Sequence, residues 1–427
     1  MSILLVCHGM PPESVGGVEQ HVAGLASALA ASGHQVHVFA RAMLPGQAQG
    51  QRTAPTGNNP QVTRVAYRWE GVDSLAAMDR CTPMAEAMRS FLADRAAAGE
   101  RFDIAHVHHL TGMSTDSLRV LDEAAVPVVM TRHDYWLFCP RGQMFHRREE
   151  ACETATPARC GECLQQTFPW WLRDDNRLAL VQELQRDARA ALQRPRHLIV
   201  PSARAIPPFE ALGVPRERFR VVENGVDTTA LAELPPPAAG PGPLRLGYLG
   251  TLMPSKGLHI LLDAIQQLPQ GLVTLDIHGN AVPYHGDQSY LTRCFQKLSP
   301  GSGVRYHGPY GLAELPHLLQ RIDVLAAPAI WQEAFGLTVR EALAAARPVL
   351  VSRIGGLQDS VQDGEQGYLL PPGDATAWAI AIRRLAENRG EVARLSRSAR
   401  TRARGFAAMA AELAAIYAET VRGPAIA

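Results

Sequence analysis

The 427 residues exceed what one hydrophobic core usually supports, because domains stop growing at roughly 250 residues, so the length predicts two domains. Hydrophobic residues make up 46% of the chain and charged residues 19%, a balance that excludes disorder as the dominant state. The formal net charge is +1 and no basic tract interleaves with aromatic residues, so we expect no nucleic-acid partner.

The first half opens on a short apolar run that predicts a β-strand. Ile3 to Cys7 has no basic region before it and leads directly into Pro11-Pro12, which argues against a signal peptide. The strand continues through Gly16-Gly17 to a helix expected at Val18–Ser32. No apolar stretch approaches the ~20 residues of a membrane-spanning helix, so we expect a cytoplasmic protein.

The second half repeats this pattern. The run Leu244–Gly250 leads through Lys256-Gly257 to a helix expected at Leu258–Leu268. Strand, glycine turn and helix form the opening of a Rossmann-like unit. Further apolar runs predict buried parallel strands at Gln35–Ala40, Ile104–His108, Pro127–Thr131, His197–Pro201, Phe219–Val222, Val273–His278, Val304–His307, Asp323–Ala327 and Pro348–Ser352.

A proline- and glycine-rich tract, Leu234 to Pro243, separates the two halves and cannot sustain a helix or an interior strand. The closing stretch Ala377–Val421 is rich in Ala, Arg, Leu and Glu, which predicts helices with breaks near Gly390 and Gly405. We therefore expect an N-terminal domain at 1–235, a linker at 236–243, a C-terminal domain at 244–400 and a final helix within 401–427.

Two carboxylates eight positions apart, Glu333 and Glu341, flank the start of a predicted helix. Free backbone N–H groups at a helix start bind anions, and Gly336 lets a phosphate approach closely. Glu333 would face a sugar, and Glu341 would accept hydrogen bonds from ribose hydroxyls. The alternative is an acidic cap followed by a solvated helix glutamate. The predicted donor-binding residues here are Glu333, Phe335, Gly336, Leu337, Thr338 and Glu341.

This pattern resembles the retaining glycosyltransferases of family 4, which carry a Glu-x7-Glu motif. The resemblance covers nearly the whole chain, and the order and spacing of its motifs are specific. It implies an α/β GT-B fold, with two Rossmann-like doubly wound parallel-sheet domains facing across a cleft, the donor on the second and the acceptor on the first. It also implies that the last helix crosses back to the first domain. The other matching motifs are Gly16-Gly17-Val18-Glu19, His133-Asp134, Asn224-Gly225-Val226-Asp227, Gly250 to Gly257, Gly355-Gly356 and Asp363 to Asp374.

The resemblance also implies roles for residues of the first half. Gly16 and Gly17 would form a glycine loop at the donor phosphate, where adjacent glycines permit positive φ, although a plain strand-to-helix turn is the alternative. His133 follows a predicted strand at its carboxyl end and would lie beside the transferred sugar. Three histidines that end an earlier strand are interpreted as lining the cleft or packed, rather than as metal ligands: His106, His108 and His109.

The segment Gly250–Gly257 should hold the donor phosphates, with Lys256 offsetting the charge of the leaving diphosphate. Many family members have Arg where this chain has Thr251, so one charged contact is missing, and Arg353 could compensate. A lysine with backbone donors in place of an Asp-x-Asp pair suggests chemistry that requires no cofactor. The catalytic residues implied are His133, Glu333 and Lys256.

Four cysteines lie within 25 residues in an expected insertion at about 139–173. Four thiolates can complete a tetrahedral structural zinc site, and the stretch Pro140–Pro169 is polar and irregular, so a metal could supply its folding energy. Unpaired thiols and disulfides stay open as alternatives. The predicted zinc ligands are Cys139, Cys152, Cys160 and Cys163.

The aromatic cluster Phe168 to Arg173 suits a membrane interface or an apolar acceptor carrier, or it packs beneath the insertion. If the cluster lies at a membrane interface, we expect the protein to contact the inner face of the membrane peripherally. We expect transfer of a hexose-type sugar from a nucleotide diphosphate sugar to a saccharide or lipid-linked acceptor, in polysaccharide or glycoconjugate biosynthesis. The alternatives are a catalytically silent binding protein and a nucleotide-sugar epimerase of the same fold.

Overall fold

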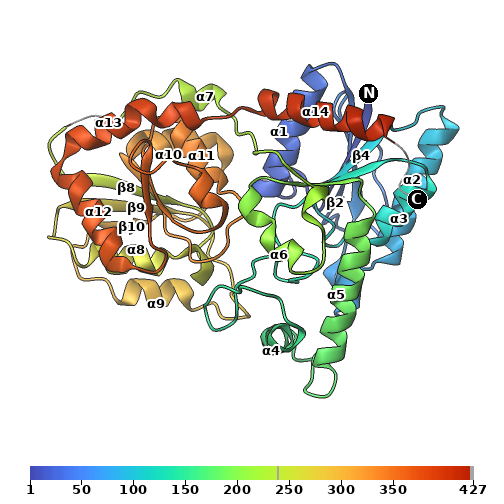
Figure 1. The fold of residues 1–427 in the computed structure, drawn as a ribbon, viewed down its shortest axis with the longest axis horizontal. Coiled ribbons are helices and arrows are strands. Elements are labelled where there is room, and N and C mark those ends of the chain that lie inside the picture. Colours follow the sequence, from blue (N-terminus) through green and yellow to red (C-terminus); the bar gives the residue numbers. More distant parts are fainter. Residues whose placement is uncertain (238–239, 424–427) are drawn as a thin grey trace. The chain divides into compact units, whose positions relative to one another are not determined.

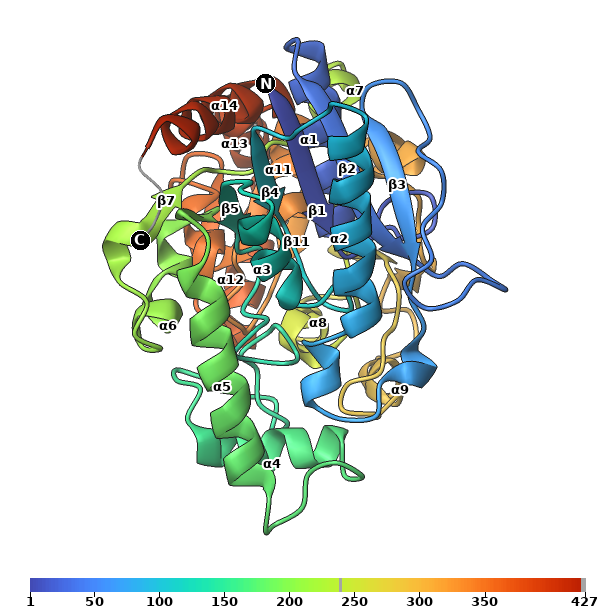
Figure 2. The same cartoon turned by 90° about the vertical axis from the view of Figure 1, so that its right-hand side faces the viewer.

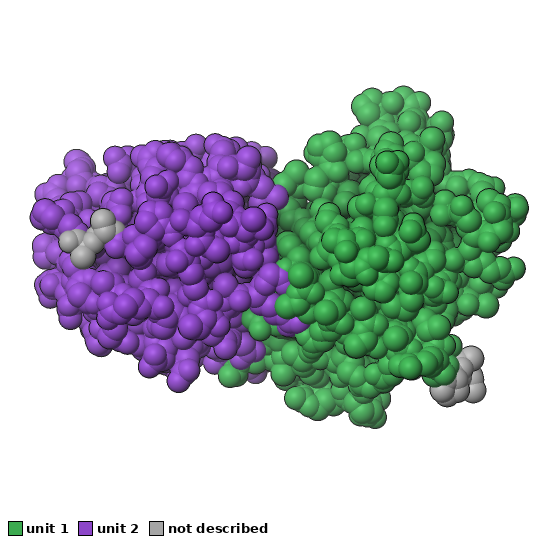
Figure 3. All heavy atoms as spheres, turned by 90° about the horizontal axis from the view of Figure 1, so that it is seen from above, with its two compact units in different colours: residues 1–142, 154–225, 406–427 green, residues 143–153, 226–405 purple. Residues whose placement is uncertain are grey.

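The computed structural model describes residues 1–237 and 240–423 and divides the chain into two compact units, coloured separately in Figure 3. Unit 1 comprises residues 1–142, 154–225 and the C-terminal residues from Phe406, and unit 2 comprises residues 143–153 and 226–405. The division falls after Gly225, whereas the sequence placed it in the tract 236–243. Residues 238–239 of that tract and residues 424–427 of the expected final helix lie outside the described residues.

Unit 1 is built on a seven-stranded parallel sheet with the order β3-β2-β1-β4-β5-β6-β7. The edge strand β3 was not predicted, because its polar side chains interrupt the apolar run that marks the buried strands. The strands are β1 (Ser2–Cys7), β2 (Gln35–Ala42), β3 (Gln61–Ala66), β4 (Ile104–Val107), β5 (Val128–Thr131), β6 (His197–Val200) and β7 (Phe219–Val221).

Helices cover this sheet, and α1 lies beside α14, the last helix of the chain (Figure 1). Val22 and Leu25 of α1 and Leu413 of α14 belong to one buried cluster with side chains of β1 and β2. Helices α2 and α3 pack side by side (Figure 2). The helices of unit 1 are α1 (Gly17–Ala31), α2 (Thr82–Ala97), α3 (Asp116–Glu123), α4 (Pro157–Thr167), α5 (Arg177–Gln193), α6 (Pro207–Glu210) and α14 (Phe406–Arg422).

The expected irregular stretch Pro140–Pro169 contains helix α4, so that expectation was wrong in part. Leu164 of α4 is buried with side chains of α5 in a small separate core, which supplies the apolar contacts that the local sequence alone does not reveal. Phe168 and Trp171 pack against this core, whereas Trp170 is 62% exposed. The aromatic cluster therefore packs with two of its rings and exposes the third.

Unit 2 is built on a six-stranded parallel sheet with the order β10-β9-β8-β11-β12-β13. The strand β13 was not predicted, because it is short and only half-buried. Trp378 of α12 is fully buried in the core beneath α8, which lies beside α12. The strands are β8 (Leu244–Leu249), β9 (Val273–His278), β10 (Val304–Tyr306), β11 (Val324–Ala327), β12 (Val349–Ser352) and β13 (Gly367–Leu370).

The C-terminal helices of unit 2 break where the sequence indicated. The expected break near Gly390 falls at Asn388, whose side chain caps the next helix by accepting from the Glu391 N–H. The helices of unit 2 are α7 (Thr229–Ala232), α8 (Leu258–Ile265), α9 (Tyr290–Gln296), α10 (Leu315–Arg321), α11 (Leu337–Ala344), α12 (Ala375–Glu387) and α13 (Arg389–Ala399).

In each sheet the strand order reverses once, between β1 and β4 in unit 1 and between β8 and β11 in unit 2. Open α/β sheets bind ligands outside the carboxyl ends of their strands at such a reversal, because the connecting loops diverge there to opposite faces. The residues that follow β1, β4 and β5, and those that follow β8 and β11, are therefore the first places to look for a site.

Candidate active site

The loop after β11 ends in a helix start that is open to an anion. Helix α11 begins at Leu337, and Gly336 caps it with φ 85°, a conformation that favours glycine. A Cβ on Gly336 would also overlap the Leu357 side chain. The first amides of α11, which include those of Leu337 and Thr338, have no partner within the helix. Phe335 is buried under the Arg340 guanidinium, so its side chain supports the loop rather than facing a ligand.

Glu333, three residues before the Gly336 cap of this helix, pairs with Lys256. The Lys256 Nζ lies 2.6 Å from Glu333 Oε1, and the Trp331 indole N–H donates to Glu333 Oε2 at 3.2 Å. Lys256 Nζ also lies 5.1 Å from the centre of the Trp331 ring. Both charged side chains keep some exposure, 26% for Lys256 and 16% for Glu333, so a ligand can still reach them.

The backbone around Glu333 is held by the glycine pair that follows β12. The Gly356 N–H donates to the Glu333 carbonyl at 2.6 Å, and Gly355 has φ 51°. A Cβ on Gly355 would overlap the backbone of Glu333. The motif Gly355-Gly356 thus holds the backbone of Glu333 in place, a role the sequence did not indicate.

Lys256 is carried by the turn that joins β8 to α8. Gly257 has φ 72°, and a Cβ there would overlap the Pro328 carbonyl oxygen just after β11. The Ile330 N–H donates to the Ser255 carbonyl at 2.9 Å. These two contacts tie the lysine loop to the glutamate loop, which explains why residues far apart in sequence form one ion pair.

We expect Gly257→Ala to destabilise the protein by more than about 3 kcal/mol, because it adds left-handed backbone strain and a clash with Pro328. Urea unfolding measures the change. Gly271→Ala is the matched control, since Gly271 has φ 78° and a Cβ added there would meet no other atom within 4 Å. The free energy of unfolding of that control should fall by only about 1–2 kcal/mol, the cost of the left-handed backbone strain alone. Equal losses in the two variants would show that the close approach to Pro328 carries no energy.

Arg353 does not supply a second cation to the predicted phosphate segment Gly250–Gly257. The Arg353 guanidinium bonds the Asp363 carboxylate and the Leu369 carbonyl, both at 3.1 Å. The hypothesis that it compensates for Thr251 therefore finds no support. The Thr251 carbonyl itself accepts from the Tyr248 hydroxyl at 3.0 Å, which orients the start of the loop.

Glu341 is partly buried on the first turns of α11, and burial raises its pKa from an ordinary 4.5 to about 7. The alternative of a freely solvated helix glutamate is therefore wrong. A carboxyl group in such surroundings is stabilised by hydrogen bonds from hydroxyl donors, because they replace the hydrogen bonds to water that burial removed. This environment suits the predicted contact with ribose hydroxyls.

Glu341→Gln should stabilise the ligand-free protein at pH 8 by roughly 2–3 kcal/mol and much less at pH 5. The folded-state pKa lies above the unfolded value, so the folded protein holds the proton more tightly. The stability associated with the protonated carboxyl is complete below about pH 4.5 and is lost as the pH rises toward 7. Urea unfolding at both pH values measures the effect, and Glu365→Gln on the exposed surface is the control. An equal shift at pH 5 and pH 8 would contradict the prediction.

In unit 1, Gly16 caps the start of α1, but its φ of −143° is extended backbone that any residue adopts. The expectation of positive φ there is wrong, and Gly17 is the first residue of the helix. Instead, a Cβ on Gly16 would come within 2.6 Å of a Glu19 carboxylate oxygen. Glu19 in turn accepts from the Ser14 hydroxyl at 2.7 Å. A side chain at position 16 would therefore have to displace the Glu19 carboxylate.

His133 follows β5, and its Nε2 lies 3.1 Å from Nδ1 of His108, which follows β4. Burial lowers the pKa of both rings well below the ordinary range, so they are neutral near pH 7. A neutral His133 can donate to a sugar hydroxyl but carries no charge to stabilise an anion. His109 lies 3.2 Å from Asp134, and His106 is bonded to Tyr417 and Thr131.

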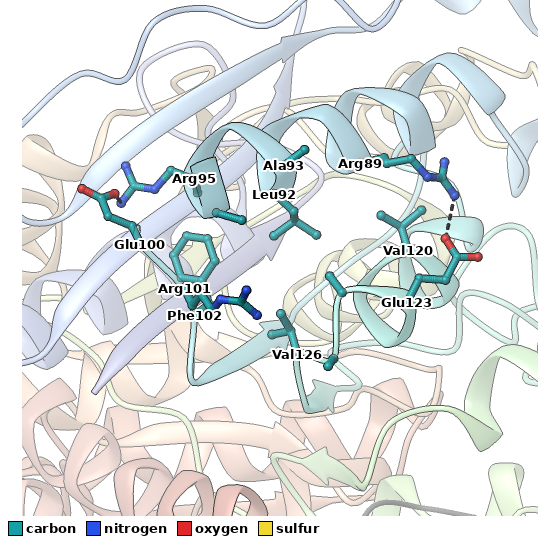
Figure 4. Close-up of a pocket in the computed structure, with 13 residues that line it drawn as sticks. Arg89, Leu92, Ala93, Arg95, Glu100, Arg101, Phe102, Val120, Glu123 and Val126 are labelled. Atoms are coloured by element: carbon teal, nitrogen blue, oxygen red, sulfur yellow. Dashed lines mark hydrogen bonds and ion pairs between the residues drawn. The ribbon is translucent and has the colours of Figure 1, made fainter. Parts of the chain in front are cut away.

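A cavity of about 510 Å³ in unit 1 lies elsewhere, between α2 and α3 (Figure 4). Its lining includes Phe102 and Val126, which precede β4 and β5, together with Arg89, Arg95 and Glu123. Phe102 and Val126 mark the amino ends of the strands, opposite to the end where doubly wound sheets bind ligands. Arg89 and Arg95 are each paired with glutamates. The cavity is therefore separate from the predicted site.

The four predicted zinc ligands are divided between the units. Cys139, Cys160 and Cys163 belong to unit 1, and Cys152 belongs to unit 2. Cys163 is buried and the other three are partly buried. The structural zinc stays a prediction.

Sequence reasoning missed two residues that the structure places at the sites. Trp331 bonds Glu333, and its signal was an indole donor two positions before that carboxylate. His21 on α1 lies with its ring 4.7 Å from that of His133. Its only signal was a histidine on the buried face of α1, which a single sequence does not distinguish from a core residue.

Two family models match the chain: Glycosyltransferase Family 4 at residues 15–230 and Glycosyl transferases group 1 at residues 235–402. With the two Rossmann-like sheets and the Lys256–Glu333 pair at a helix start, they define a nucleotide-sugar glycosyltransferase with the GT-B fold. The chain belongs to glycosyltransferase family 4, as the sequence motifs predicted, and it is an enzyme of that family.

Relatives match along nearly the whole chain. Glycogen synthase of Mycobacterium tuberculosis is 27% identical over 94% of this chain and 90% of its own length. Phosphatidyl-myo-inositol mannosyltransferase of Mycobacterium leprae is 29% identical over 87% and 84%. D-inositol 3-phosphate glycosyltransferase of Corynebacterium efficiens is 27% identical over 95% and 90%.

Solved structures share the fold. Sucrose-phosphate synthase of Thermosynechococcus elongatus matches with a TM-score of 0.71 and 22% identity, over 98% of this chain and 99% of that one. Anabaena HepE in complex with UDP matches with a TM-score of 0.67 and 18% identity, over 98% and 100%. The catalytic domain of starch synthase IV from Arabidopsis thaliana, bound to ADP and acarbose, matches with a TM-score of 0.70 and 17% identity, over 99% of each. Among the described residues, no helix combines the length and apolarity needed to span a bilayer.

Proposed function

We propose that this enzyme moves a hexose-type sugar from a nucleotide diphosphate sugar to a hydroxyl of a saccharide or lipid-linked acceptor, with retention of configuration at the anomeric carbon. The biological setting we propose is polysaccharide or glycoconjugate synthesis at the cell surface. The observation that carries the proposal is the Lys256–Glu333 ion pair, 2.6 Å long, whose glutamate lies three residues before the Gly336 cap of α11. Similar folds that hold UDP, or ADP with acarbose, support a nucleotide donor.

In the proposed reaction, the diphosphate lies at the α11 amides and draws the Lys256 ammonium away from Glu333. Lysine and amides then offset the charge that builds on the leaving phosphate as the sugar bond breaks. Glu333, released from Lys256, faces the sugar ring. Neutral His133 donates a hydrogen bond to a sugar hydroxyl. The donor phosphate takes the acceptor proton on the same face of the sugar, so no side-chain nucleophile is needed.

The chain offers a direct test because it contains only two lysines, Lys256 and the exposed Lys297. UDP, GDP and ADP, each with and without a sugar, are compared by thermal shift. The nucleotide that stabilises the protein is then tested for protection of Lys256 against amine acylation, read by peptide mapping. We expect Lys256 to be protected and Lys297 to react as before. Stabilisation without protection of Lys256 would place the nucleotide elsewhere and overturn the proposal.

Thr251 leaves the phosphate segment with one cation fewer than the family motif that it resembles, so the products formed with the preferred nucleotide sugar test whether transfer is retained. Transfer to an added saccharide, or slow hydrolysis of the donor, supports the enzyme. Release of an epimerised donor without any acceptor would indicate the epimerase instead.

The cysteine insertion carries two further proposals. We propose that Cys139, Cys152, Cys160 and Cys163 hold a structural zinc ion, which metal analysis of the purified protein would detect together with protection of all four thiols from alkylation. The exposed Trp170, three residues before Arg173, would serve peripheral contact with a membrane carrying a lipid-linked acceptor. Unchanged partitioning of Trp170→Ala onto anionic vesicles would contradict that membrane contact.

A further inference from the structure

Three histidines from three different elements of unit 1 converge on one point. His21 comes from α1, His108 follows β4 and His133 follows β5. One ring nitrogen from each lies within 4.8 Å of those of the other two. His21 and His108 are 3% and 0% exposed. The parallel sheet contributes to this convergence, because β4 and β5 are neighbours, and the His21 ring lies 5.3 Å from that of His108 and 4.7 Å from that of His133.

Several of these nitrogens lack a partner. Within residues 1–237 and 240–423, neither ring nitrogen of His21 accepts or donates a hydrogen bond. His106 shows the contrast, because its nitrogens lie 2.6 Å from the Tyr417 hydroxyl and 2.7 Å from the Thr131 hydroxyl. Buried polar atoms are rarely left unpaired, since they lose water without replacement. The orphaned imidazole of His21, beside the rings of His108 and His133, therefore points to a missing ligand.

We propose that His21, His108 and His133 bind a divalent transition-metal ion, of which Zn²⁺ is the best match. Two imidazole nitrogens on one tetrahedral zinc ion lie about 3.3 Å apart, given zinc–nitrogen bonds of about 2.0–2.1 Å. The separation between His108 Nδ1 and His133 Nε2 is 3.1 Å. Three imidazoles leave a fourth position for water or another small ligand. This revises the interpretation of His108 as a cleft-lining or packed side chain rather than a metal ligand.

The protonation states agree with this geometry. Burial lowers the pKa of His21 to about 3 and holds those of His108 and His133 well below their usual range. The rings are therefore neutral, the form that binds metals. A bound ion would withdraw His133 from the sugar, so it would inhibit transfer. That consequence alone rests on the proposed function, whereas metal binding does not.

The test titrates the full-length protein with Co²⁺ and then displaces it with Zn²⁺, after the thiols have been alkylated. Tetrahedral Co²⁺ shows visible ligand-field bands, and thiolate ligands add charge-transfer absorption in the near ultraviolet. We expect one equivalent of Co²⁺ to bind with ligand-field bands and without thiolate absorption. X-ray absorption of the zinc-loaded protein should show nitrogen and oxygen scatterers only. Absence of Co²⁺ binding, or coordination by sulfur ligands alone, would overturn the proposal. This test uses the wild-type protein and needs no variant.

The variant His21→Phe keeps an aromatic ring and removes no hydrogen bond, because His21 makes none within the described chain. We expect its dissociation constant for Co²⁺ to rise at least about tenfold. His34→Gln changes a histidine of the same unit outside the cluster and should bind as the wild type does. Equal affinity of His21→Phe and wild type would overturn the assignment of His21.

Discussion

Lys256→Ala should lower kcat/KM by roughly 10²–10³-fold, a loss of about 2.7–4 kcal/mol of transition-state stabilisation. The physical reason is that Lys256 is the side-chain cation at the start of α11, where the leaving diphosphate would develop its charge. Binding of the free nucleoside diphosphate should weaken as well, since the product carries the same charge. Initial rates with the preferred donor, and calorimetric titration with the nucleotide, measure the two effects.

Lys297→Ala provides the matched control, because Lys297 is the other lysine and lies exposed beyond α9. It should retain wild-type kinetics. Removing the lysine leaves the partly buried Glu333 carboxylate without its cation, which is destabilising. Circular dichroism must therefore first establish that Lys256→Ala is folded. A folded Lys256→Ala enzyme with undiminished kcat/KM would refute the assigned role of this lysine.

Glu333→Gln should lower kcat by about 10²-fold or more while leaving nucleotide affinity equal or tighter. In the ligand-free protein, Glu333 holds Lys256 by a charged hydrogen bond that the amide cannot reproduce at full strength. The variant therefore frees Lys256 for the diphosphate, yet removes the negative charge that faces the sugar. Separate measurement of kcat and of the nucleotide dissociation constant resolves the two effects.

The control is Glu365→Gln, an exposed glutamate in the same unit. It should change neither quantity. If Glu333→Gln weakened nucleotide binding and kept kcat, Glu333 would act by organising the phosphate site, and its place beside the sugar would be wrong. Trp331→Phe, which removes one donor to Glu333, should show a smaller effect of the same kind.

Much of the fold followed from local patterns. The apolar runs of β1, β4 and β8 marked buried parallel strands, because both faces of such strands are covered by helices. The edge strand β3 and the short strand β13 escaped prediction, since partial exposure mixes polar with apolar residues. Helix α4 escaped because its packing partners come from α5 and from residues near 75–78, not from its own neighbourhood in sequence.

The candidate site also contains some features that the sequence predicted and others that only the structure showed. Gly336 was predicted as a glycine that lets a phosphate approach, whereas its left-handed backbone, which Gly257 shares, was seen only in the structure. The positive φ expected at Gly16 was wrong, because its backbone is extended, and only the structure shows the Glu19 carboxylate beside it. The raised pKa of Glu341 was also beyond the sequence, since burial depends on which segments cover the side chain.

By itself, the sequence determined the two Rossmann-like halves, the open helix start after Glu333 and membership of the family. These follow from residue spacing along one strand, turn or helix, where neighbours in sequence are neighbours in space. Only the tertiary structure brought Lys256 against Glu333, 77 residues later, and gathered His21, His108 and His133. Those contacts depend on the order in which strands pair within each sheet, and strand order joins residues that no local pattern connects.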